Sequence, residues 1–100
     1  MRNKTKVVIV GAGILGATIA YNLSNHNKVD ITIVESKSPC SGASSHSFSW
    51  LNSFGKDPSE YHQLNRLSIG MWNRFSDSLG GKIGFHQGGE VHLENTDRAT

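Results

Sequence analysis

Two short apolar runs and the segment between them organise the first 35 residues of the chain. Val7 to Val10 is a uniformly apolar, β-branched run, which predicts a strand buried on both faces of a parallel sheet. Residues 14–25 then place apolar side chains at helical intervals, and residues 29–34 form a second apolar run. Two strands joined by a helix of this length predict a right-handed parallel crossover over residues 6–35.

A polar stretch separates this unit from a second amphipathic segment. Residues 36–49 are mostly small and polar, which predicts a loop. A helix is predicted over residues 57–79, because Asp57 is a good N-cap, Pro58 suits the first helical position and Glu60 lies three residues after the cap. Its predicted buried face consists of Leu64, Leu67, Met71, Trp72, Phe75 and Leu79.

The remainder of the chain is rich in glycine. Gly80 and Gly81 predict the end of the helix. Residues 83–85 and 90–93 predict two short strands around a turn at residues 88–89. The expected fold class is therefore α/β, with a Rossmann-like parallel sheet, one long amphipathic helix and a short terminal strand pair.

The glycine spacing at residues 11–16 carries the clearest chemical signal. The run Gly11-Ala12-Gly13-Ile14-Leu15-Gly16 matches Gly-x-Gly-x-x-Gly between a predicted strand and a predicted helix. In such a motif Gly11 permits the tight turn, Gly13 lets a pyrophosphate approach the backbone, and Gly16 lets helix and strand pack closely. The free amides and the dipole of the helix N-terminus would then hold the phosphates.

An acidic residue completes this dinucleotide fingerprint at the end of the second predicted strand. Glu35 stands nineteen positions after Gly16, where it would accept hydrogen bonds from a ribose of the adenosine half. Its charge would repel a 2′-phosphate, which argues against NADP. NAD and FAD both bind to units of this kind, so the residues themselves leave that choice open.

Three segments of the chain resemble the D-amino-acid oxidase superfamily, with its glycine oxidase, sarcosine oxidase and D-amino-acid dehydrogenase branches. They are residues 7–17, residues 31–35 and the phrase Gly42-Ala43-Ser44-Ser45. The resemblance implies that residues 1–100 are the N-terminal part of an FAD-binding domain, with the substrate domain absent. It also implies oxidation of the C–N bond of an amino acid or secondary amine by hydride transfer to the flavin.

The resemblance extends the candidate FAD-binding residues into the polar loop, where small side chains and backbone amides suit close approach to the flavin. Many family members place Arg or Asn in this loop, whereas this chain has Ser45-His46-Ser47. In dimethylglycine dehydrogenases a His at about this place carries covalent flavin, so His46 is a candidate for such a link. The full set of candidates is Gly11, Ala12, Gly13, Ile14, Leu15, Gly16, Glu35, Ser36, Gly42, Ala43, Ser44, Ser45 and His46.

Charge and composition argue against several other classes of protein. The net charge is +2 and the basic residues are scattered, so nucleic-acid binding is not expected. Cys40 is the only cysteine, which favours a reducing compartment such as the cytoplasm. No apolar run reaches the roughly 18 residues of a membrane span. No metal site is expected from the histidines, and His62 is expected to be solvated on its helix.

Three functions remain open on the sequence. The preferred one is the FAD-binding portion of an oxidoreductase that acts on a small amine or amino acid. The second is the Rossmann unit of an NAD-dependent dehydrogenase, because the same fingerprint serves NAD. The third is a non-catalytic fragment that only binds a nucleotide or a partner chain.

Overall fold

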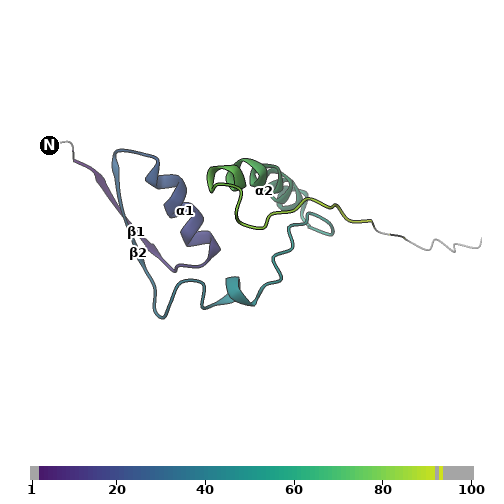
Figure 1. Ribbon diagram of the computed structural model, residues 1–100, viewed down its shortest axis with the longest axis horizontal. Coiled ribbons are helices and arrows are strands. Elements are labelled where there is room, and N and C mark those ends of the chain that lie inside the picture. Colours follow the sequence, from purple (N-terminus) through teal and green to yellow (C-terminus); the bar gives the residue numbers. More distant parts are fainter. Residues whose placement is uncertain (1–2, 92, 94–100) are drawn as a thin grey trace, which may run out of the picture. The chain divides into compact units, whose positions relative to one another are not determined.

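The computed structural model describes residues 3–91 and 93, and it divides the chain into two compact units (Figure 1). The first unit extends to Trp50 and the second begins at Leu51. The first contains the strands β1 (Thr5–Val10) and β2 (Val29–Val34), the helix α1 (Ile14–Ser24) and the 3-10 turn η1 (Ala43–His46). The second contains the helix α2 (Ser59–Ser78).

The first unit is the predicted β–α–β crossover. Strands β1 and β2 pair in parallel, with Val7 opposite Ile31 and Ile9 opposite Ile33. Helix α1 connects them and lies along the sheet, as Figure 1 shows. The β-branched runs and the glycine break therefore fold as the sequence predicts.

Only one face of this sheet is covered among the described residues. Val7 and Ile9 are half-buried on the side of α1. Their neighbours Val8 and Val10 point to the other face and are 63% and 85% exposed. The prediction that β1 is buried on both faces is therefore wrong here, because α1 packs against a single face and side chains alternate along a strand.

Helix α2 begins one residue later than its predicted cap implies. Its N-cap is Pro58 and not Asp57, and the cap makes no side-chain hydrogen bond. The Pro58 carbonyl instead accepts hydrogen bonds from the Tyr61 and His62 amides, at 2.9 and 3.3 Å. Because proline has no N–H of its own, an extended Pro58 with ψ near 177° starts the helix without losing a donor.

The apolar face of α2 is only partly covered within its own unit. Trp72 packs edge-on against Phe75 at 5.4 Å and stacks on Phe85 at 5.9 Å between ring centroids. Leu64, Leu67 and other residues of the predicted buried face stay exposed, which corrects that prediction. Periodicity identifies the apolar side of a helix but does not supply the surface that covers it.

The glycine-rich segment after α2 reverses the chain and, over its described residues, forms no strand. Gly80, Gly81 and Gly84 all have positive φ, and the Gly81 amide donates to the Ser76 carbonyl at 2.8 Å. The prediction of a strand at residues 83–85 is therefore wrong, because the positive φ of Gly84 interrupts an extended backbone. The second predicted strand, residues 90–93, lies partly outside the described residues.

Candidate dinucleotide-binding site

The glycine loop begins where β1 ends. The Gly11 amide donates a hydrogen bond to the Val34 carbonyl at 2.8 Å, so the loop leaves the sheet directly beside the end of β2. Gly11 has φ +102°, a region that L side chains rarely adopt, and a Cβ there would meet nothing within 4 Å. Gly11 is therefore required for the backbone turn and borders open space.

The other two motif glycines permit close approach of atoms within the chain. A Cβ at Gly16 would collide with the Gly11 carbonyl and lie 3.3 Å from Cγ2 of Ile9, so only glycine lets α1 pack this closely on β1. A Cβ at Gly13 would lie 3.0 Å from Oγ of Ser44. The neighbour of Gly13 in this structure is thus a serine of the polar loop.

Ser44 caps the N-terminus of α1 across a long sequence interval. Its hydroxyl oxygen accepts a hydrogen bond from the Ile14 amide at 2.9 Å. The local N-cap residue, Gly13, has no side chain to do so. The sequence places Ser44 in the candidate set, but nothing in the sequence signals this cap, because the two residues are 30 positions apart.

Glu35 lies against the glycine loop. One carboxylate oxygen accepts the Ala12 amide at 2.9 Å, and the other accepts the Lys37 amide at 3.1 Å and the Ser36 hydroxyl at 3.3 Å. Hydrogen bonds from the Ala12 amide first, and from the Lys37 amide second, hold the pKa of the Glu35 carboxyl below its ordinary value. The carboxylate is therefore ionised at neutral pH, at the position where the fingerprint places a ribose acceptor.

Donors for an anion remain at the same end of α1. Among the described residues, the Gly13 and Leu15 amides donate no hydrogen bond within the chain. No acidic side chain lies in the first turn of α1 to compete for them. Free amides at a helix N-terminus attract phosphate groups, so the loop retains the chemistry that the motif predicts.

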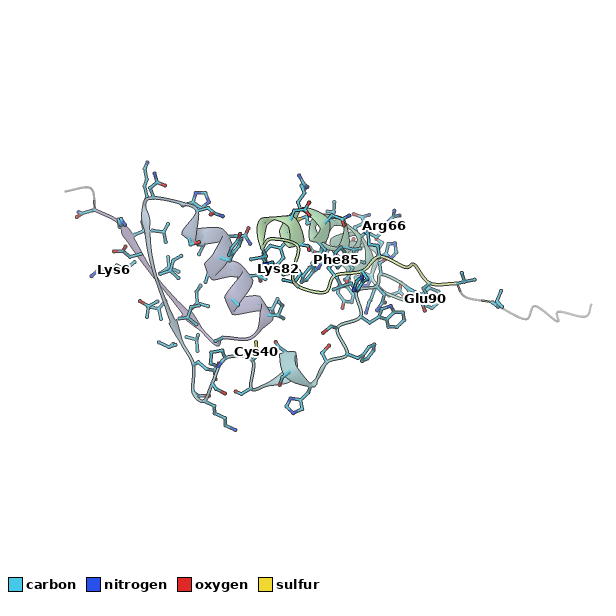
Figure 2. All side chains as sticks on the ribbon, viewed as in Figure 1. Lys6, Cys40, Arg66, Lys82, Phe85 and Glu90 are labelled. Carbon is cyan, nitrogen blue, oxygen red and sulfur yellow. The ribbon has the colours of Figure 1, made fainter. Side chains whose placement is uncertain are left out.

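The polar loop runs past the glycine loop and contains η1. The Cys40 amide donates to the Ala12 carbonyl at 3.0 Å, and Figure 2 shows Cys40 near the N-terminal end of α1. Further on, Nδ1 of His46 lies 2.8 Å from the Gly42 carbonyl oxygen. A carbonyl can only accept, so Nδ1 carries the proton and Nε2 of the neutral ring is left without one.

Three other expectations concern residues away from this loop. His62 is half-buried, and its Nδ1 lies 2.7 Å from the Ser53 carbonyl, so the expectation that it is solvated is wrong. Within the described residues, no group of three or more His, Cys, Asp or Glu side chains could hold a metal ion. In the same part of the chain, neither helix is both long and apolar enough to cross a membrane.

The strand, glycine loop, helix, strand and terminal acid together define a dinucleotide-binding unit of the Rossmann type. Comparison with known proteins identifies the family within this class of nucleotide-binding proteins. Residues 6–100 match the family model described as FAD dependent oxidoreductase, so the chain belongs to that family. FAD is the cofactor of the family.

The chain is similar to proteins that act on amines. It is 25% identical over 95 residues to the mitochondrial dimethylglycine dehydrogenase of Rattus norvegicus, and 24% identical over 95 residues to that of Homo sapiens. It is 29% identical over 91 residues to the 4-methylaminobutanoate oxidase (formaldehyde-forming) of Paenarthrobacter nicotinovorans. These matches cover 95%, 95% and 91% of this chain but only 11% of each relative. No solved structure matches the chain significantly.

The residues of the site fit the ADP portion of FAD. Open space beside Gly11 and the free amides of Gly13 and Leu15 suit a pyrophosphate. The Glu35 carboxylate has lone pairs left for ribose hydroxyls, because each of its oxygens can accept more than one hydrogen bond. The chain's own residues would therefore hold the adenosine and pyrophosphate groups.

Proposed function

We propose that this chain binds the ADP portion of FAD for an enzyme that oxidises a C–N bond of an amine or amino acid. The observation that carries the proposal is the free amide pair, Gly13 and Leu15, beside an ionised Glu35. FAD held by these residues would supply the acceptor for a hydride from the carbon attached to the substrate nitrogen. The contribution of this chain is to hold and orient the nucleotide end of the cofactor.

The names of the relatives suggest a substrate class. Dimethylglycine and 4-methylaminobutanoate are both amino acids with an N-methyl group. We therefore propose an N-methylated amino acid as the substrate, within the wider class of secondary and tertiary amines. No residue of this chain is assigned to the reacting carbon, because the site described here lies at the nucleotide end.

The binding step is tested with the purified full chain. Isothermal titration should give one FAD site, and ADP should compete for it because both ligands share the pyrophosphate and adenosine groups. Riboflavin, which lacks both, should bind much more weakly. Equal affinity for riboflavin and FAD would contradict the proposed use of the glycine loop, and so would failure of ADP to compete.

The catalytic step is tested on the protein isolated from its native cells, whatever its full length. It should carry a flavin absorption spectrum that N-methylated amino acids bleach under anaerobic conditions. N-methylated amines without a carboxylate serve as the matched comparison. A protein without a flavin spectrum that reduces added NAD+ to NADH when an N-methylated amino acid is supplied would support the NAD-dependent alternative.

A further inference from the structure

We propose that Glu35 is a positioning residue that shapes the glycine loop before any nucleotide arrives. The proposal rests on the proposed function and goes beyond a ribose contact. Its basis is the 2.9 Å hydrogen bond from the Ala12 amide to Glu35, which joins the middle of the glycine loop to the end of β2. Glu35 therefore acts on the phosphate site through the backbone of Ala12.

Both backbone polar groups of Ala12 are hydrogen-bonded to the segment that follows β2. Its amide donates to Glu35, and its carbonyl accepts the Cys40 amide at 3.0 Å. The residue before it, Gly11, is tied to Val34 by its own amide. Three hydrogen bonds from residues 34–40 thus fix two consecutive residues of the loop.

This arrangement also decides which amides of the loop are already used within the chain. Because the Ala12 amide is occupied by Glu35, the donors left for a phosphate are in the residues that follow it, among them the Gly13 and Leu15 amides. Glycine-rich backbone loses more conformational entropy on ordering than any other. A loop that is ordered in advance does not bear that cost when the ligand binds, so its affinity rises.

The carboxylate is suited to this role by its own contacts. Its second oxygen is held by the Lys37 amide at 3.1 Å and by the Ser36 hydroxyl, so the side chain is oriented from its own strand end. Removing the carboxylate would release the Ala12 amide. A glutamine would keep one acceptor oxygen and restore part of the hold.

Nucleotide affinities distinguish a Glu35 that positions the glycine loop from a Glu35 that only contacts the ribose hydroxyls. The affinities of wild type and Glu35→Ala for ADP and for 2′,3′-dideoxy-ADP are measured on the full chain, with Glu60→Ala as a control for lost charge. We expect Glu35→Ala to lower the affinity for dideoxy-ADP by roughly tenfold, which is the effect of losing one charge-assisted hydrogen bond. Unchanged affinity for dideoxy-ADP would overturn the proposal, because a ribose contact alone predicts that result.

Amide hydrogen exchange of the unliganded chain tests the same point without a nucleotide. The Ala12 amide should be protected in wild type, lose protection in Glu35→Ala and regain part of it in Glu35→Gln. The Gly11 amide, bonded to Val34, should stay protected in all three and so reports that the unit is folded. Equal Ala12 exchange in wild type and Glu35→Ala would overturn the proposal. If wild type binds no nucleotide, the proposed function fails while this measurement still decides the role of Glu35.

Discussion

The hydroxyl oxygen of Ser44 lies 2.9 Å from the amide nitrogen of Ile14, so the polar loop caps the first helix. This contact joins the two halves of the candidate site, because Ile14 follows the glycine loop directly and Ser44 belongs to η1. The cap also places Ser44 Oγ 3.0 Å from where a Cβ on Gly13 would lie. Several consequences of this packing can be measured.

Ser44→Ala should destabilise the first unit. A serine that caps a helix contributes about 1 kcal/mol, because its loss leaves an amide without a partner. Urea unfolding followed by circular dichroism measures the change. Ser41→Ala in the same loop is the control, since no side-chain hydrogen bond of Ser41 involves the cap. Equal stability of the two variants would show that the cap contributes nothing.

Gly16→Ala should destabilise the chain although alanine is the better helix former. A Cβ at Gly16 meets the Gly11 carbonyl, and overpacking of this kind typically costs about 1–3 kcal/mol. Gly70→Ala is the matched control in α2, where a Cβ meets nothing within 4 Å. It should stabilise α2 by about 0.5–1 kcal/mol. Thermal unfolding of both variants should therefore shift in opposite directions.

The contribution of Glu35 to stability should depend on pH in a defined direction. A carboxyl whose pKa is lower in the folded chain than in the unfolded chain stabilises the fold above its ordinary pKa. That contribution is lost as the pH falls through the lowered pKa. The Tm difference between wild type and Glu35→Gln should thus be constant near neutral pH and shrink in acid. A difference that grows on acidification would contradict this.

The resemblance to dimethylglycine dehydrogenases makes His46 a candidate for a covalent flavin link, and an exposed loop histidine without such a link is the alternative. The contact of Nδ1 with the Gly42 carbonyl leaves Nε2 as the ring nitrogen with a free lone pair. Acid precipitation of flavin-loaded protein from its native cells is the measurement. Yellow colour should stay with the pellet and move to the supernatant in His46→Ala. A colourless wild-type pellet would exclude the link.

The 100 residues by themselves should bind nucleotide without turnover. Val8 and Val10 are 63% and 85% exposed, so one face of the sheet has no cover in the described part of the chain, and we expect a flavin ring to lack a second wall there. Hydride transfer requires an oriented ring and substrate. Expressed residues 1–100 are mixed with FAD and assayed with amino acids and secondary amines. Turnover of roughly 1 per second or faster, as in ordinary enzymes, would contradict this expectation.

Local signals explain why the β–α–β unit could be predicted from sequence. The β-branched runs, the spacing of the three motif glycines and the acid at the end of β2 each act within a few residues. The hydrogen bonds from Ala12 to Glu35 and from Ile14 to Ser44 span 23 and 30 positions and follow no repeat. These hydrogen bonds form only because the polar loop after β2 returns to the glycine loop, and no periodic pattern in the sequence predicts that return.

Burial was the weaker part of the sequence prediction, for a related reason. An apolar face indicates that burial would be favourable, but it does not identify the residues that bury it. On α2, Trp72 packs against Phe75 and Phe85, whereas Leu67 stays 69% exposed. The strand predicted at residues 83–85 does not form, because Gly84 has a positive φ angle that extended backbone does not have.

The two-stranded sheet has a consequence for the behaviour of the chain in solution. In the part of the chain that the structure describes, β1 and β2 pair only with each other, so each strand has one edge with no hydrogen-bonded neighbour. Open edges beside exposed valines are templates for pairing with other chains. Concentrated preparations of the isolated chain are therefore prone to aggregation through these edges, and dilute conditions or a charged residue in place of Val10 would reduce it.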